Sequence, residues 1–378
     1  LYVLLLDDIN ADATRTNRVR AAARQFIERN MGANDLAAVV HTSGRADGAQ
    51  DFTSSRRLLT QAVDRFMGRK LRSATLNKID MYNLTRGGVG GATANDPEQT
   101  ERLFKAEGVL MTVGSLADWL AGIHGRRKAV VFFSEGIDYN IWDTMGPGGV
   151  PTSPADATRR GDGTILISRA QDAIAAATRA NVNIYAIDPR GLTMAGDNAI
   201  EMTGLPPDAE SLGLGMASLQ DELRDQQQSL RTLAEETGGF ASVSNNDFTG
   251  AFRRIVDENS SYYVLGYYAT NEKRDGRFRK IEVRLKRPGL SVVARKGYVA
   301  PKGKPAADKK ADAGAPVSKE LREAVNSPLQ LTDLKLAVFA APLKGTSQKA
   351  TVAVVTQFLG KDLSFTPTAG KFANVIEM

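Results

Sequence analysis

The chain has 378 residues, 42% of them apolar, so it is long enough for two domains with sizeable cores. Its net charge is +6 without one dominant run of lysine and arginine, so we expect no nucleic-acid binding. The absence of cysteine excludes disulfides, thiolate nucleophiles and cysteine-ligated metals, and with only two histidines a histidine-rich metal site or a Ser-His-Asp triad is hard to build.

The first predicted element is the apolar run Leu1–Leu6, which ends directly in Asp7 and Asp8. A continuous apolar run of this length is typical of a strand buried on both faces, as in a parallel sheet covered by helices. The segment KAVVFFSEGID repeats this arrangement, with Glu135 and Asp138 just past a second buried run. Open α/β folds bind ligands at the carboxyl ends of their strands. The sequence therefore predicts two acid-tipped strands that meet at one edge of a sheet.

Strands and helices alternate through residues 1–260, which predicts an α/β domain with a doubly wound, mostly parallel sheet and helices on both faces. Residues 36–43 form the next predicted strand, and 51–55 are its antiparallel partner at the sheet edge. Residues 143–163 have the composition of a loop. The remaining predictions are helices at 19–27, 56–67, 103–123 (starting near Asp96-Pro97-Glu98), 167–180, 219–239 and 248–260, and strands at 127–136, 182–192 and 239–244.

The pattern changes after residue 260. Residues 261–300 predict a β-hairpin extension packed on the first domain, because strands follow one another there without helices. Residues 301–316 are rich in proline, alanine, lysine and glycine and predict a linker. Residues 317–378 predict a partial β-sandwich-like domain. The individual predictions are strands at 262–270, 278–287, 290–300, 331–343 and 349–359 and a short helix at 318–327.

The turn DDINAD places several oxygen-bearing side chains close together. Hard cations such as Mg²⁺ take carboxylate and amide oxygens together with water. The spacing of Asp8, Asn10 and Asp12 lets alternate side chains of an irregular turn face one ion, with Asp7 beside them and Glu135 approaching from the neighbouring strand. These five residues are the candidate Mg²⁺ ligands. The other interpretation is that Asp8 or Asn10 caps the following helix and that no ion is needed.

The same acids suggest a second class of function, a Mg²⁺-dependent phosphoryl-transfer enzyme or a receiver-like domain. Receivers carry an acidic pair after the first strand, as Asp7 and Asp8 do here. Haloacid-dehalogenase-type phosphatases need Asp-x-Asp at that place, whereas Asn10 stands at the second position and no convincing partner lysine follows. The glycine-rich stretch GGVGGATA lacks the phosphate-binding patterns GxxxxGK[ST] and GxGxxG. Phosphoryl transfer therefore stays the alternative hypothesis.

Several segments together resemble a von Willebrand factor type A domain, and more narrowly the bacterial VWFA-related family. The tyrosine-rich run and the hairpin after it are the most specific, because ordinary A domains lack them. The resemblance covers about residues 1–300 and implies a Rossmann-like sheet, a role in adhesion or protein–protein interaction, and no catalytic activity. The matching segments are LYVLLLDDIN, DLAAVVHTS, RKAVVFFSEGID, VNIYAID, LAEETGGFASV and the run from SYYVLGYYAT to VVARKGY.

Typical members of this family hold a divalent ion at a metal-ion-dependent adhesion site with the pattern Asp-x-Ser-x-Ser. The first aspartate matches Asp7 or Asp8. With Asp7, the two serines become Ile9 and Ala11, which have no ligating atoms. With Asp8, they become an asparagine and an aspartate, which can bind a cation.

The same adhesion site uses a threonine and a later aspartate, and a carboxylate of the partner completes the coordination. The later aspartate matches Glu135, and Thr93 in the glycine-rich stretch is the candidate for the threonine. The resemblance thus implies either a degenerate Mg²⁺ site or an interaction face without metal. In both cases a partner protein would bind at the carboxyl-end face of the sheet.

The sequence begins and ends inside predicted strands, so we expect a fragment from which any export signal is missing. The resemblance implies an exported bacterial protein, extracellular or periplasmic. No stretch is long and apolar enough to predict a membrane span. The overall prediction is a protein-binding module that is not an enzyme.

Overall fold

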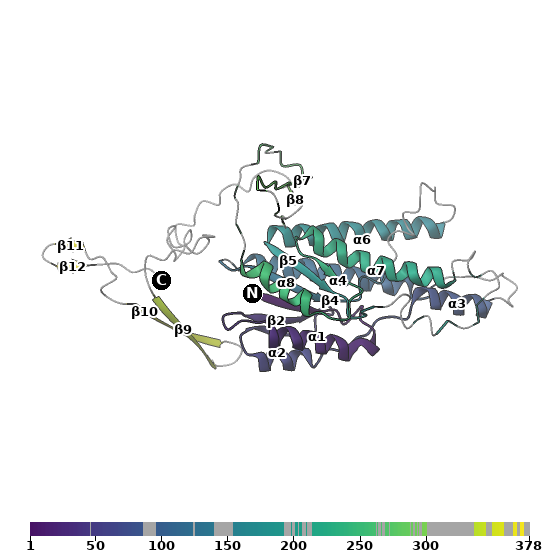
Figure 1. The fold of residues 1–378 in the computed structure, drawn as a ribbon, viewed down its shortest axis with the longest axis horizontal. Helices are drawn as coiled ribbons and strands as arrows, with labels where there is room; N and C mark the ends of the chain where they lie inside the picture. Colours follow the sequence, from purple (N-terminus) through teal and green to yellow (C-terminus); the bar gives the residue numbers. More distant parts are fainter. Residues whose placement is uncertain are drawn as a thin grey trace. The chain divides into compact units, whose positions relative to one another are not determined.

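The computed structural model describes residues 1–45, 47–85, 96–123, 125–139 and 154–192, residues 198–300 with short interruptions, and residues 336–344, 350–358, 366–368 and 371–373. The chain divides into two compact units. The first unit comprises Leu1–Gly122 and Arg127–Lys304, and the second comprises Ile123–Arg126 and Pro305–Met378. The first unit contains the predicted α/β domain (Figure 1).

A six-stranded sheet in the order β3-β2-β1-β4-β5-β6 forms the centre of the first unit. All neighbouring strands are parallel except β3, which pairs with β2 in the antiparallel direction at one edge. Strands β1, β4 and β5 are buried along their whole length, as their apolar runs predict. The α/β prediction is confirmed at this level. The strands are β1 (Tyr2–Leu6), β2 (Ala37–His41), β3 (Gln50–Thr53), β4 (Lys128–Phe133), β5 (Val182–Ile187) and β6 (Ala241–Ser242).

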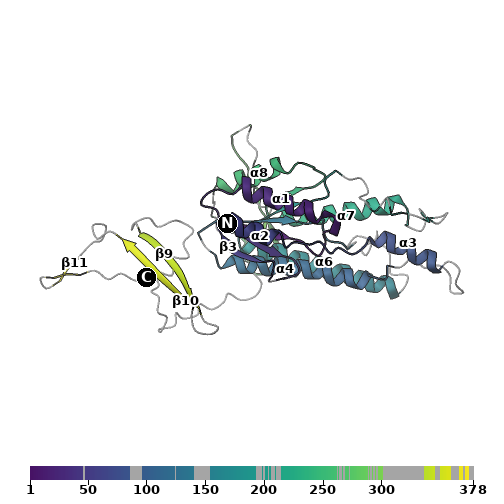
Figure 2. The same ribbon diagram turned by 90° about the horizontal axis from the view of Figure 1, so that it is seen from below.

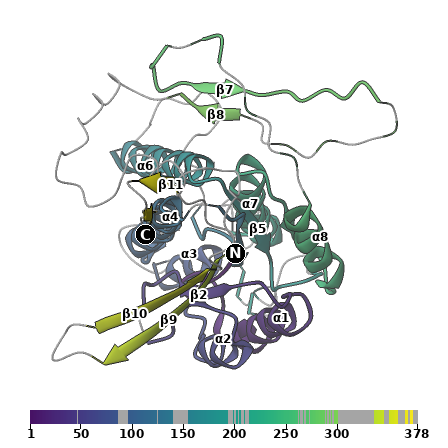
Figure 3. The same ribbon diagram turned by 90° about the vertical axis from the view of Figure 1, so that its left-hand side faces the viewer.

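Helices cover both faces of the sheet (Figures 2 and 3). On one face, α1 (Thr16–Arg29), α2 (Arg56–Val63) and α8 (Thr249–Ser260) bury their apolar stripes against alternate residues of the strands. On the other face, α4 (Gln99–Ala121) packs along α6 (Pro154–Arg179), and α7 (Met216–Glu236) contacts β5 and β6. The loops that join strands to helices are thereby fixed at the carboxyl ends of the strands.

The loop prediction for residues 143–163 is wrong over its second part, because α6 already begins at Pro154. Proline suits the first turn of a helix, where its missing N–H costs nothing. The glycines at 161 and 163 lower helix propensity, but packing of α6 along α4 overrides such a local preference. Residues 140–153 lie outside the described part of the chain.

A further helix, α3 (Ala74–Thr85), was not expected from the sequence, where the apolar periodicity around it is weak. Its Leu76 and Ile79 pack against Leu214, just before α7, and Leu219, in the first turn of α7. Figure 1 shows α3 beyond the edge of the sheet where the parallel strands end. This helix therefore flanks the edge that carries the acidic residues.

The strands predicted at 278–287 and 290–300 are shorter in the structure, because 281–286 and the described residues of 290–296 are not in strands. β7 (Phe278–Lys280) pairs with β8 (Gly297–Val299), and no strand is seen among the described residues of 262–270. In the second unit, β9 (Leu336–Lys344) pairs with β10 (Ala350–Phe358), and β11 (Thr366–Thr368) pairs with β12 (Lys371–Ala373), all antiparallel. The predicted linker 301–316 and helix 318–327 lie outside the described residues. The β-sandwich-like domain at 317–378 and the packing of the hairpin extension 261–300 on the first domain stay predictions.

Candidate functional site

Asp7 lies fully buried at the end of β1 and ties three strand ends together. Its Oδ1 accepts hydrogen bonds from the backbone N–H of Asn10 (3.1 Å) and from Oγ1 of Thr42 (2.7 Å), which follows β2. Its Oδ2 accepts from Nδ2 of Asn10 (3.1 Å) and from Oγ of Ser134 (2.5 Å), which follows β4. Burial raises the pKa of Asp7, and these hydrogen bonds oppose the rise.

Asp8 is also buried, but it is paired with a cation. Its Oδ1 accepts from the backbone N–H of Ser43 (3.0 Å), and its Oδ2 accepts from Oγ of Ser43 (2.7 Å) and from the guanidinium of Arg69 (2.6 Å). Burial acts to raise the pKa of Asp8, but the hydrogen bonds from Ser43 and the contact with Arg69 outweigh it and lower the pKa. Asp8 is therefore held in its ionised form.

Asp12 provides the helix cap of this turn. Its Oδ1 accepts hydrogen bonds from the backbone N–H (2.8 Å) and from Oγ1 (2.6 Å) of Thr14, at the start of the short 3₁₀ helix Ala13–Arg15 that precedes α1. The interpretation that Asp8 or Asn10 caps the following helix is wrong, because the capping side chain is that of Asp12. The amide of Asn10 is directed at Asp7 instead.

Glu135, which follows β4, is buried and contacts both the turn after β1 and a lysine. Its Oε1 accepts from the backbone N–H of Asp12 (2.9 Å), and its Oε2 pairs with Nζ of Lys70 (3.2 Å). Lys70 also donates to Oε1 of Gln226 on α7 (3.1 Å). Burial acts to lower the pKa of Lys70, but the charges of Glu135 and Asp138 outweigh it, so the pKa is raised. The ammonium therefore stays charged.

The segment Gly68-Arg69-Lys70 brings both cations to the acidic turn. The backbone N–H of Arg69 donates to the carbonyl of Asp8 (2.9 Å), and that of Lys70 donates to the carbonyl of Ala11 (3.0 Å). A Cβ atom on Gly68 would lie 2.4 Å from the carbonyl oxygen of Ala11, closer than real Cβ contacts come. Glycine is required here because the two backbones touch.

A further cation, the buried Arg190, follows β5. It forms an ion pair with Asp188 (2.9 Å), and its Nη1 donates to Oε1 of Gln226 (2.6 Å). Burial acts to lower the pKa of Arg190, but Asp188 and the other nearby acids outweigh it and raise the pKa. The amide of Gln226 in turn donates to Asp138 (2.8 Å), which also pairs with Arg102 on α4. One continuous polar network therefore runs under the carboxyl edge of the sheet.

This network forms the floor of a pocket of about 270 Å³. Residues from the ends of β1, β4 and β5, the segment after α2, and α7 line it. Arg72 and Glu201 stand exposed at its rim and pair with each other (3.2 Å). The lining residues are Asp12, Thr14, Arg15, Lys70, Leu71, Arg72, Ser73, Glu135, Arg190, Asn198, Glu201, Leu219, Glu222, Leu223 and Gln226. The pocket presents four acidic and four basic side chains.

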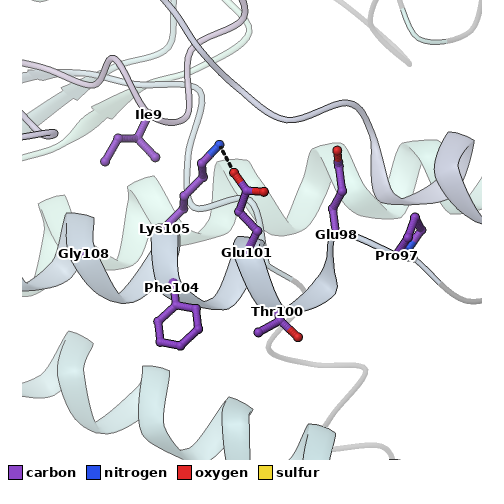
Figure 4. A pocket seen from close by; sticks show the side chains of 8 residues that line it. All are labelled: Ile9, Pro97, Glu98, Thr100, Glu101, Phe104, Lys105 and Gly108. Atoms are coloured by element: carbon purple, nitrogen blue, oxygen red, sulfur yellow. Dashed lines mark ion pairs between the residues drawn. The ribbon is translucent and has the colours of Figure 1, made fainter.

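A second hollow of about 580 Å³ lies along the first turns of α4 (Figure 4). Its only charged contact drawn is the ion pair between Glu101 and Lys105 (3.0 Å) on the same helix. Phe104, two-thirds exposed, and Ile9 give it an apolar lining. Glu98 in its lining pairs with the buried Arg102 (3.5 Å), but the hollow's own charged side chains, Glu98, Glu101 and Lys105, are partly or fully exposed, so it is the weaker candidate.

The predicted Mg²⁺ ligands do not fit a metal ion as they are placed. Asp7 is surrounded by N–H and O–H donors, while Asp8 and Glu135 each face a protein cation. A Mg²⁺ ion needs oxygen lone pairs directed at it in near-octahedral geometry. Among the residues that the structure describes, no three histidine, cysteine, aspartate or glutamate side chains are grouped to hold a metal. Mg²⁺ binding stays a prediction, and Thr93 lies outside the described residues.

No protein-family model matches the chain, and no curated protein is significantly similar to it. The resemblance to A domains therefore rests on the segments quoted above. Among the described helices, none combines the length and the apolar composition that a bilayer span requires.

Sequence reasoning missed the cations and most of the hydrogen-bond donors of the site. Thr42, Ser43 and Ser134 follow strand ends, so the rule that found Asp7 could have found them too. Arg69 and Lys70 come from a turn after a helix and lie about 60 positions from Asp8 and Glu135. The only local signal was a glycine followed by two basic residues.

Proposed function

We propose that this chain is a protein-binding module of the von Willebrand A type, which recognises its partner at the carboxyl-end face of the sheet. The observation that carries the proposal is the charged pocket built from three strand ends and α7. In open α/β sheets, ligands bind at this edge, just outside the carboxyl ends of the strands. Because the sequence resembles the bacterial VWFA-related family, we also propose that the protein is exported and works outside the bacterial cytoplasm.

The character of the pocket suits a protein partner. Its buried cations and acids are held by several hydrogen bonds each, so the floor is rigid, while Arg72 and Glu201 offer exposed charges of both signs at the rim. Complementary charges at the edge of an interface mainly determine which partner is accepted and how fast it associates. A surface of this kind is suited to selective protein recognition.

The alternative of Mg²⁺-dependent phosphoryl transfer is less well supported. A carboxylate nucleophile or metal ligand must reach the substrate, whereas Asp7 and Asp8 are almost completely inaccessible and accept hydrogen bonds at both oxygens. Turnover of a generic phosphoester that is lost in Asp7→Asn would favour this alternative.

The proposal is tested by charge removal at the rim. The full chain is used to capture proteins from the extracellular fraction of its source. The dissociation constant of each captured protein is then measured for wild type, Arg72→Gln and Arg24→Gln. Arg24 is the matched control, because it is also a half-exposed arginine in a surface ion pair. It lies on α1 and pairs with Asp64 at the end of α2. We expect Arg72→Gln to weaken the true partner about tenfold, equivalent to about 1.4 kcal/mol, and Arg24→Gln to leave it unchanged.

Both variants are first compared with wild type by circular dichroism and thermal unfolding. Equal affinity of every captured protein for wild type and for a folded Arg72→Gln would contradict binding at this face. So would a partner that Arg24→Gln weakens as strongly.

A further inference from the structure

Lys70 stands among oxygen atoms in the way that a bound cation does. Its Nζ lies 3.2 Å from Oε2 of Glu135 and 3.1 Å from Oε1 of Gln226, at the floor of the charged pocket. Its side chain is only 9% exposed, and that of Glu135 only 4%. A carboxylate and an amide oxygen from two different elements therefore converge on one buried positive charge.

The cation arrives on a backbone that is itself fixed. Gly68 allows the segment after α2 to pack against the turn after β1, and the N–H groups of the next two residues donate into that turn. The neighbouring Arg69 forms an ion pair with Asp8 (2.6 Å), so the two consecutive basic residues pair with two different acids. The positions of both cations are thus determined by main-chain contacts rather than by chance encounters of flexible side chains.

We infer that the ammonium of Lys70 is a built-in cation that takes the place of a divalent metal ion at the carboxyl edge of the sheet. A buried acid such as Glu135 must be paired, and Lys70 supplies the charge that an ion would otherwise bring. The edge is therefore complete without metal. This inference does not depend on the proposed function, because it holds whether or not a partner protein binds.

The inference predicts a gain of metal binding when the lysine is removed. In Lys70→Ala, Oε2 of Glu135 loses its cation, while Oε1 of Gln226 keeps its hydrogen bond from Arg190 (2.6 Å) and has one lone pair released. The space of the missing side chain opens to the pocket. One or two carboxylate or amide ligands completed by water are the donor set that Mg²⁺ and Mn²⁺ accept. Mn²⁺ is the probe, because the electron paramagnetic resonance signal of the free ion falls when the ion is bound.

The experiment titrates Mn²⁺ into four forms of the full chain: wild type, Lys70→Ala, Lys70→Ala/Glu135→Gln, and Lys105→Ala. Lys105 is the matched control, because it also pairs with a glutamate, Glu101, but on the surface of α4. We expect Lys70→Ala to bind about one Mn²⁺ with a dissociation constant of about 1 mM or tighter. Wild type and Lys105→Ala should bind at least tenfold more weakly, and the double variant should lose the gained site.

Each other outcome overturns the inference. A folded Lys70→Ala that binds Mn²⁺ no better than wild type would show that Lys70 occupies no cation position. Wild type that binds Mn²⁺ as tightly as Lys70→Ala would show that the lysine replaces nothing. If Lys70→Ala is unfolded in EDTA, Mn²⁺ must restore its circular dichroism, and failure to do so would also overturn the inference.

Discussion

The ionisable residues at the carboxyl edge show how a folded chain keeps acids in its interior. An ionised carboxylate removed from water loses several kcal/mol of hydration, and only a well-placed partner offsets that loss. Four acids of the network at this edge have a cation each. The pairs are Asp8 with Arg69, Glu135 with Lys70, Asp138 with Arg102, and Asp188 with Arg190. Among the described residues no cation pairs with Asp7, which instead accepts hydrogen bonds from Asn10, Thr42 and Ser134, and burial raises its pKa.

His41 at the end of β2 gives a prediction for the pH dependence of stability. It is buried, its Nε2 contacts the carbonyl of Gly48 (3.1 Å), and burial lowers its pKa below the ordinary value. The unfolded chain therefore takes up a proton at higher pH than the folded chain does. The contribution of neutral His41 to the free energy of unfolding is fully present above its pKa in the unfolded chain, about 6.5. It is lost as the pH falls from there through the pKa of His41 in the folded chain.

The measurement is the free energy of unfolding in urea at pH 7.5 and at about pH 5.5, above the range in which ordinary carboxylates titrate. We expect wild type to lose stability over this interval and His41→Gln to lose clearly less. His124→Gln is the control, since the chain has only these two histidines. A His41→Gln profile as steep as that of wild type would show that another group titrates.

At the level of secondary structure, the sequence predicted the elements that have a strong pattern of their own. The runs that became β1, β4 and β5 are apolar throughout, and α1 carries its buried residues at helical spacing. The missed helix α3 and the early start of α6 have little amphipathic pattern, and their packing partners α7 and α4 come from elsewhere in the chain.

Of the candidate site, the sequence predicted the acids but not their partners, again because only local patterns are visible in a sequence. Acids at strand ends are visible in the sequence, because burial of the preceding strand is encoded locally. Their partners Lys70, Gln226 and Arg190 are brought in by tertiary packing, so no spacing rule relates them to Glu135. The degenerate metal pattern could be seen, but the cations that face these acids could not.

The segment after α2 gives a prediction on how elements are joined. A Cβ atom on Gly68 would lie 2.4 Å from the carbonyl oxygen of Ala11 and 2.6 Å from that of Asp12. Gly68→Ala must therefore push the segment away from the turn after β1. We expect a loss of about 1–3 kcal/mol in the free energy of unfolding, measured with urea, as for other overpacked sites.

Gly108→Ala in α4 is the matched control for this substitution. A Cβ atom there meets nothing within 4 Å, and alanine is the better helix former by up to about 1 kcal/mol. The control should therefore be neutral or slightly stabilising. Equal stability of Gly68→Ala and wild type would contradict the close backbone contact.

At the scale of the whole molecule, the charged pocket belongs to the first unit alone. All of its lining residues lie between Asp12 and Gln226, and none comes from Pro305–Met378. In the described part of the second unit, two antiparallel pairs are formed, β9 with β10 and β11 with β12. The acidic edge and its cations are therefore a property of the α/β domain.

Thermal unfolding of the full chain in EDTA, Mg²⁺ and Ca²⁺ tests most directly whether this edge is held by the protein's own cations. We expect the same Tm in all three solutions, because Lys70 and Arg69 already neutralise the acids that an ion would bind. An ion present at about 100 times its dissociation constant would add about 2.7 kcal/mol and raise Tm by several degrees. Such a rise in Mg²⁺ or Ca²⁺, abolished by Asp8→Ala, would contradict a metal-free face and restore the adhesion-type metal site.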